Sequence, residues 1–124
     1  MARAEVRKSN AMQDLARAIE ILGEIKRLHI GKQWAFAHDR YSAVRTLIIE
    51  IRTATNDVIR TSDEGQLNSC IQSLAQYERD AARYLRDGSP EPKVDSIDAR
   101  VREMESELSS VLGWLQSQEH RDVG

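Results

Sequence analysis

Residues that interrupt helices are scarce in this chain of 124 residues. It contains two prolines and six glycines, and both prolines, Pro90 and Pro92, fall within one short segment. Proline removes a backbone donor and clashes with the preceding turn of a helix, so its absence elsewhere permits long helices. The length is that of one domain, which is enough for a self-supporting core.

Cysteine and long apolar runs are also nearly absent. The single cysteine, Cys70, cannot form an intramolecular disulfide, and it falls where an apolar helix face is expected. We therefore expect a buried thiol and a reducing compartment. No segment resembles a signal peptide, and no window approaches the 18 consecutive apolar residues of a membrane span. The sequence predicts a cytoplasmic protein with no membrane span.

Motifs that carry chemistry are missing. Neither a GxGxxG pattern nor a Walker-type phosphate loop occurs. The histidines are His29, His38 and His120, and no Asp or Glu stands three residues before any of them, as a di-metal helical bundle would require. His29 is expected to be a hydrogen-bonded residue of the core or of a helix end. We expect no cofactor, no metal and no catalytic residues, and the balance favours a protein that is not an enzyme.

What the sequence does have is a repeat of apolar residues alternately three and four apart, which places them along one stripe of a helix. The repeat occurs in four segments. The first runs Leu15, Ala18, Leu22, Ile25, His29, and the second runs Trp34, Ala37, Tyr41, Val44, Ile48, Ile51, Thr55, Val58. The third runs Leu67, Cys70, Leu74, Tyr77, Ala81, Tyr84, and the fourth runs Ile97, Val101, Met104, Leu108, Val111, Leu115.

The phase of this repeat shifts between segments, so the helices must be separate. Gly31 marks a reversal with left-handed backbone, since glycine commonly follows a helix end. Asp63 followed by Gln66 resembles a capping box, and Asp95 or Ser96 is expected to cap the last helix. The predicted helices are 4–30, 33–61, 64–86 and 95–118, with a linker at 87–94. Short connections make neighbours antiparallel, so we predict one all-α domain, an up-and-down antiparallel four-helix bundle.

Charge is uneven along the chain. Residues 1–62 hold eleven Lys or Arg against seven Asp or Glu, and residues 63–124 hold seven against thirteen. The halves, at +4 and −6, would attract one another in a folded bundle. We predict that Arg45 or Arg52, which flank the second stripe, faces the acidic edge of the fourth helix at Asp98, Glu105 and Glu107.

Aromatic residues make up only 5% of the chain, yet several begin the second segment. Trp34, Phe36 and Tyr41 lie there, and Trp114 lies near the end of the fourth, so we expect both tryptophans at one end of the bundle. An aromatic cluster that closes the core is the first interpretation, and a partner-binding patch is the alternative. Gly113 is expected to allow close approach of another helix.

Two functional hypotheses follow. The first is a non-enzymatic module for protein–protein interaction or scaffolding, which binds another protein or a second copy of itself. Its predicted binding residues are Trp34, Tyr41, Arg45, Arg52 and Trp114. The alternative is a nucleic-acid-binding domain with one basic face over the first two helices. That face would comprise Arg17, Lys26, Arg27, Arg40, Arg45 and Arg52.

Overall fold

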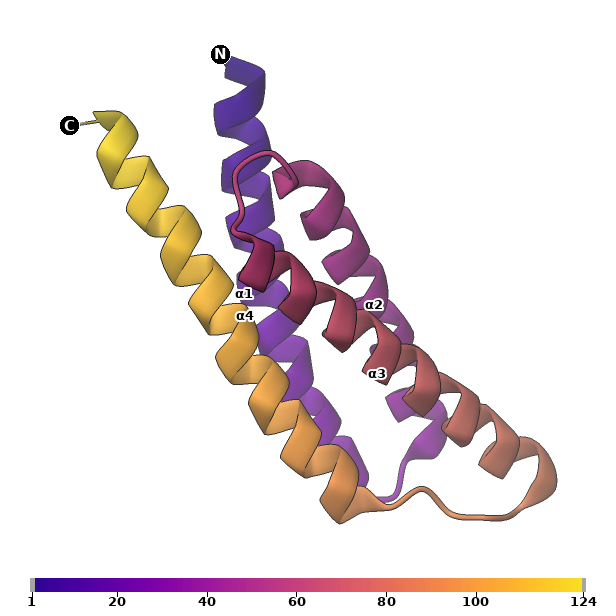
Figure 1. Ribbon diagram of the computed structural model, residues 1–124. Helices are drawn as coiled ribbons and strands as arrows, with labels where there is room; N and C mark the ends of the chain where they lie inside the picture. Colours follow the sequence, from indigo (N-terminus) through magenta and orange to yellow (C-terminus); the bar gives the residue numbers. More distant parts are fainter. Residues whose placement is uncertain (1, 124) are drawn as a thin grey trace.

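The computed structural model describes the backbone of residues 2–123 and the side chains of residues 7–118, and this part of the chain is all α-helical (Figure 1). The helices are α1 (Ala2–Ile30), α2 (Trp34–Thr55), α3 (Thr61–Asp87) and α4 (Val94–Val123). They run up and down, so the first and last helices bring the two ends of the chain to the same end of the molecule (Figure 1). The predicted fold class is confirmed.

Each helix packs against two others. α1 contacts α2 and α4, and α3 contacts the same two helices, so α1 lies diagonally across the bundle from α3. This arrangement encloses a single interior into which all four apolar stripes can point. For convenience, the end that contains the α1–α2 turn and the end of α3 is called the turn end, and the end with the α2–α3 connection is called the opposite end (Figure 1).

The predicted stripes form the core. In the second stripe every residue from Trp34 to Thr55 is buried, and Ile48 has no exposed surface. Leu74 of α3 and Leu108 of α4 are equally inaccessible, and all belong to one continuous hydrophobic cluster. Burying a side chain of this size contributes about 1.5–3 kcal/mol, so the stripes account for most of the stability of the bundle.

The boundary between the second and third helices differs from the prediction. α2 ends at Thr55 rather than at 61, and the amide groups of Val58 and Ile59 donate to the Thr55 carbonyl in a turn. α3 then begins at Thr61 rather than at 64, and Asp63 accepts a hydrogen bond from the backbone amide of Arg60 at 3.2 Å. Asp63 therefore lies inside the first turn and is not the N-cap, because the helix starts one turn earlier than the pattern indicated.

The α1–α2 turn is a Schellman motif shifted by one residue from the prediction. The Gln33 amide donates to the Leu28 carbonyl at 3.0 Å, and the Lys32 amide donates to the His29 carbonyl at 3.1 Å. These bonds put the left-handed position at Lys32, with φ 53°, and not at Gly31. Gly88, with φ 77°, does terminate α3 as its place in the linker predicted. α4 begins at Val94, so Asp95 lies in its first turn instead of capping it.

Candidate functional site

A chain of buried polar groups joins three helices at the turn end. His29, near the end of α1, makes hydrogen bonds through Nδ1 to Asp98 of α4 at 2.6 Å and through Nε2 to the Tyr41 hydroxyl of α2. His29 and Tyr41 are buried and Asp98 is partly exposed. Burial, followed by the nearby Asp98 carboxylate, raises the pKa of Tyr41 well above its ordinary range. A carboxylate only accepts, so Nδ1–H of His29 donates to Asp98, and in this tautomer of the neutral ring Nε2 accepts from the Tyr41 hydroxyl.

Aromatic rings surround this chain. The His29 ring lies 5.4 Å from that of Trp34, which meets Tyr84 of α3 edge-on at 6.3 Å, and Tyr41 lies 5.7 Å from Tyr77. The expectation of a hydrogen-bonded core histidine is confirmed, as is an aromatic cluster that closes the core at Trp34 and Tyr41. Both of these predicted binding residues are buried, so neither is available to a partner in this arrangement of the bundle.

The two tryptophans lie at opposite ends, and the prediction that they share an end is wrong. Trp114 donates from Nε1 to the Val58 carbonyl at 2.9 Å, and the Arg60 guanidinium lies 4.6 Å from the centre of its ring. α2 and α4 run in the same direction, so a residue at the start of one cannot meet a residue near the end of the other (Figure 1). Trp114 holds the α2–α3 connection against α4, partly through a cation–π contact.

Arg45 and Arg52 face α3, not α4 as predicted. Arg45 makes a bidentate pair with Glu78, and Arg52 donates to the Asn68 side chain at 2.8 Å. The reason is the order of the helices, since α2 is flanked by α1 and α3 and lies diagonal to α4. The pair with Glu78 raises the pKa of Arg45, in keeping with a guanidinium that stays charged in the α2–α3 interface.

The acidic edge of α4 has other partners. Glu105 accepts a hydrogen bond from Lys26 of α1 at 2.7 Å, in addition to the bond between Asp98 and His29 described above. Glu107 pairs with Arg100 of its own helix at 2.5 Å. Asp98 and Glu105 therefore contact α1, and Glu107 contacts Arg100 in the α3–α4 interface.

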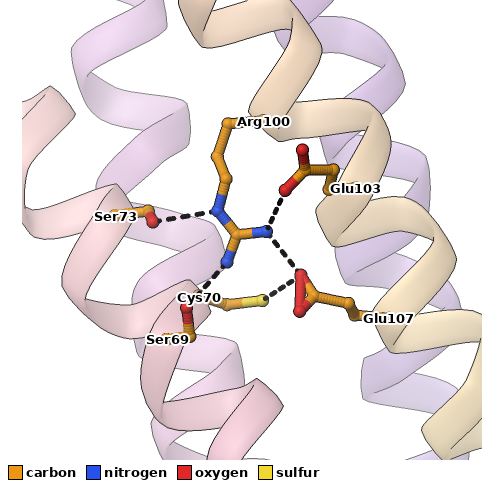
Figure 2. Close-up of polar contacts among 6 residues, drawn as sticks. All are labelled: Ser69, Cys70, Ser73, Arg100, Glu103 and Glu107. Atoms are coloured by element: carbon orange, nitrogen blue, oxygen red, sulfur yellow. Dashed lines mark hydrogen bonds and ion pairs between the residues drawn. The ribbon is translucent and has the colours of Figure 1, made fainter.

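Arg100 forms the polar centre of that α3–α4 interface (Figure 2). It projects from α4 toward α3, where it donates to the Ser69 hydroxyl at 3.0 Å and to Ser73 at 3.1 Å, and it also reaches Glu103 and Glu107. The Arg100 side chain is only 16% exposed, and its contacts with Ser73 and Glu107 are partly buried, whereas those with Ser69 and Glu103 are exposed. One guanidinium thus connects two helices by hydrogen bonds in place of apolar packing.

Cys70 lies beside this network and is buried as predicted. Its Sγ is 3.9 Å from the Glu107 carboxylate, a contact that Figure 2 shows. Burial, followed by the Glu107 charge, raises the pKa of the Cys70 thiol to about 12. A nucleophilic cysteine needs a lowered pKa and access to solvent, so both the burial of Cys70 and the direction of its pKa shift oppose thiolate chemistry at this position.

The six cations predicted to form one nucleic-acid-binding face point in different directions. Lys26 faces α4, Arg40 pairs with Glu24 of α1 at 3.0 Å, and Arg45 faces α3. Most of this set therefore serves contacts between helices, because the flanking positions of each stripe meet a neighbouring helix. The prediction of a single basic face over α1 and α2 is wrong.

Large hydrophobic side chains are exposed at the turn end. The large hydrophobic residues with most exposed surface in the described part of the chain are Ile30 at 82%, Phe36 at 56% and Leu85 at 52%. They come from the end of α1, the start of α2 and the end of α3, all of which lie at the turn end of the bundle (Figure 1). Phe36 stood out in the sequence for its aromatic neighbours, whereas Ile30 and Leu85 were missed because each continues a helical segment without belonging to its stripe.

A row of arginines on α3 was also missed. Arg79, Arg83 and Arg86 are exposed and follow the spacing of four and three residues that places side chains on one face. Together with neighbours on the same helix they line a shallow depression whose residues are Gln76, Arg79, Asp80, Ala82, Arg83 and Arg86. The spacing is visible in the sequence, and a search for charged residues by helical face would have found it.

The fold and these contacts define the class of protein, a four-helix bundle with internal polar connections. Among the side chains described, no three His, Cys, Asp or Glu come together as ligands for a metal ion, and His120 lies outside that part. None of the described helices is both long enough and apolar enough to cross a membrane. Comparisons of the chain with protein-family models, curated proteins and solved structures find no match.

Proposed function

We propose that this protein is a non-enzymatic interaction module that binds another protein through the turn end of its bundle. The observation that carries the proposal is that three large hydrophobic side chains at this end, Ile30, Phe36 and Leu85, are exposed, whereas the other large apolar side chains among residues 7–118 are buried or partly buried. Single exposed apolar residues are ordinary on protein surfaces, but several gathered at one end of a small domain are typical of a binding surface.

The interior behind this surface supports the same proposal. The backbone that carries Ile30 and Phe36 is held by the hydrogen bonds of the α1–α2 turn and by the packing of Trp34 and His29 behind it. A surface fixed in this way loses little conformational freedom on binding, which favours affinity. Trp34 and Tyr41 would then contribute by supporting the binding residues, and Arg45, Arg52 and Trp114 by maintaining the bundle.

Site-specific photo-crosslinking in cells tests the proposal. A photoreactive phenylalanine analogue replaces Phe36 in one variant and Ser109, an exposed residue of α4 on the outer surface, in the matched control. We expect a discrete crosslinked product from position 36 that is absent from position 109. Its mass distinguishes a second copy of the chain from a different protein, and sedimentation of the purified protein checks the first case.

The binding surface predicts how that product responds to mutation. Ile30→Ser and Leu85→Ser remove apolar area at exposed positions, so they should reduce the crosslink from position 36. The free energy of unfolding should change by no more than about 0.5 kcal/mol. Equal crosslinking from positions 36 and 109, or a product insensitive to both substitutions, would contradict the proposal.

A further inference from the structure

The arginine row on α3, Arg79, Arg83 and Arg86, is set apart from other arginines of the molecule by its contacts. Arg45, Arg52 and Arg100 each bond to a neighbouring helix. By contrast, the polar partners of the row in the described part of the chain lie on α3 itself, close in sequence. Arg79 donates to Gln76, Arg83 to Asp80 and Arg86 to Asp87. The row therefore does nothing to hold the helices together.

The row carries more positive than negative charge. Three guanidinium groups face two carboxylates, those of Asp80 and Asp87, and Asp80 also accepts a hydrogen bond from Gln76. This local excess is opposite in sign to the chain as a whole, whose net charge is −2. Exposed pairs between near neighbours contribute little to stability, so the guanidinium groups can exchange them for the carboxylates of a partner at little cost.

Apolar surface accompanies the charge. Ala82 lines the same depression as the arginines, and Leu85, which is half exposed, lies outside that depression, about 100° from Arg86 around the axis of α3. Asp80 and Arg83 also border a second depression, whose other lining residues are Tyr77, Pro90, Glu91, Pro92, Lys93, Ser96 and Ile97, so its cations Arg83 and Lys93 are balanced by Asp80 and Glu91. The two depressions thus adjoin along the edge of α3 and offer cations next to apolar side chains.

We infer that this surface binds an acidic, amphipathic segment of a partner protein, with the arginine row pairing with its carboxylates and Leu85 meeting its apolar side chains. The inference rests on the proposed function and adds the chemistry of the partner. Arginine forms planar, bidentate pairs with carboxylates and is enriched at interface hot spots. A nucleic acid fits less well, because Tyr77, the aromatic residue that borders the second depression, packs its ring against Tyr41 in the aromatic cluster.

A titration followed by NMR tests the inference. The probe is a short synthetic helical peptide with glutamate on one face and leucine on the other, compared with the same peptide in which glutamine replaces every glutamate. We expect the glutamate peptide to shift the Nε–H signals of the row and the methyl signals of Leu85. We expect the glutamine peptide to bind at least about tenfold more weakly.

Variants separate this surface from general charge attraction. A variant that combines Arg79→Gln, Arg83→Gln and Arg86→Gln should bind the glutamate peptide about tenfold or more weakly than the native chain. Arg17→Gln is the matched control, because Arg17 is equally exposed and pairs only with Glu20 of its own helix in the contacts described, and it should leave the affinity unchanged. All four positions are exposed, so each variant is expected to keep the wild-type melting temperature.

Several results would overturn the inference. These are no saturable binding of the glutamate peptide, equal binding of the glutamine peptide, shifts that map away from α3, and equal weakening by Arg17→Gln. Tighter binding of a single-stranded oligonucleotide than of the peptide, with a steep salt dependence, would also overturn it in favour of a nucleic-acid partner. A crosslink from Phe36 that persists in any of these cases would leave the proposed function intact and refute only the acidic partner.

Discussion

At the scale of single residues, the polar chain at the turn end determines how α1, α2 and α4 meet. Tyr41 donates to His29, and His29 donates to Asp98, so each buried group has a partner. A buried polar group without a hydrogen-bond partner destabilises the fold by the full free energy of its desolvation, whereas a hydrogen-bonded pair stabilises the fold only modestly. The cost of disrupting this chain should therefore exceed the strength of any single bond in it.

Tyr41→Phe tests this point. The substitution keeps the ring but leaves Nε2 of buried His29 without its donor, so we expect a loss of about 1–3 kcal/mol in the free energy of unfolding, measured with urea. Tyr84→Phe is the control, because Tyr84 contacts Trp34 through its ring, and its change should stay within about 0.5 kcal/mol. Equal losses in the two variants would show that His29 does not depend on the hydroxyl.

The Cys70 thiol gives a prediction about pH. Its pKa is raised from 9.0 to about 12, so the folded state keeps the proton where the unfolded state releases it. The contribution to stability is full below pH 9 and is lost as the pH rises from 9 toward 12. We expect a shallower alkaline decline in melting temperature for Cys70→Ala than for the native chain. Iodoacetamide should label Cys70 rapidly in denaturant and slowly in the native protein at pH 8, and fast native labelling would contradict the assigned burial.

At the scale of the helices, Gly113 shows that a glycine inside a helix does not always mark close approach of a neighbouring helix. The sequence suggested that this glycine admits a neighbouring helix, but a Cβ built there would meet nothing within 4 Å, and the position is exposed. No contact therefore requires glycine inside α4, where it costs about 0.5–1 kcal/mol relative to alanine.

Gly113→Ala should accordingly stabilise the protein by about 0.5–1 kcal/mol in urea unfolding. Gly88→Ala is the contrasting variant. It also meets no neighbour, but its φ of 77° is strained for alanine, so it should destabilise by about 1–2 kcal/mol. Opposite signs from two equally unobstructed glycines would show that backbone conformation, and not space, separates them.

Arg100 is the corresponding test of the α3–α4 interface. Arg100→Ala removes the donors to Ser69 and Ser73 and leaves Glu107 beside the buried thiol without its cation, so we expect a loss of about 1–3 kcal/mol. Arg102→Ala, at an exposed position on nearly the opposite side of α4, should change stability by less than about 0.5 kcal/mol. A melting temperature for Arg100→Ala equal to that of Arg102→Ala would mean that α3 and α4 are held by apolar packing alone.

The sequence predicted the stripes well and the contacts between helices poorly, for a physical reason. An amphipathic helix buries its apolar stripe whichever helix it packs against. The helical period alone therefore identifies buried residues such as Leu22, Ile48 and Leu108. The partner of Arg45 depends instead on which helices are neighbours, which no local pattern contains. The predicted end of α2 was also wrong, because α2 ends at Thr55 in a turn, whereas Val58 continues the apolar spacing in the sequence.

At the scale of the whole molecule, the charge asymmetry of the sequence is expressed as contacts between its halves. Lys26 of α1 pairs with Glu105 of α4, and Arg45 of α2 pairs with Glu78 of α3. The basic half and the acidic half are thus joined along both of their shared interfaces. Because these pairs are partly exposed, they select which helices are neighbours more than they add stability.

The continuous core implies that the bundle unfolds as one unit, and the tryptophans at its two ends provide local probes. Trp34→Phe leaves only Trp114 at the opposite end, and Trp114→Phe leaves only Trp34 at the turn end. If no helix pair can bury its stripe alone, fluorescence and far-ultraviolet circular dichroism should give coincident urea transitions within each variant. Loss of fluorescence from either tryptophan before loss of helix would separate that end from the rest and contradict a single domain. Such a result at the turn end would also remove the rigid support on which the proposed binding surface depends.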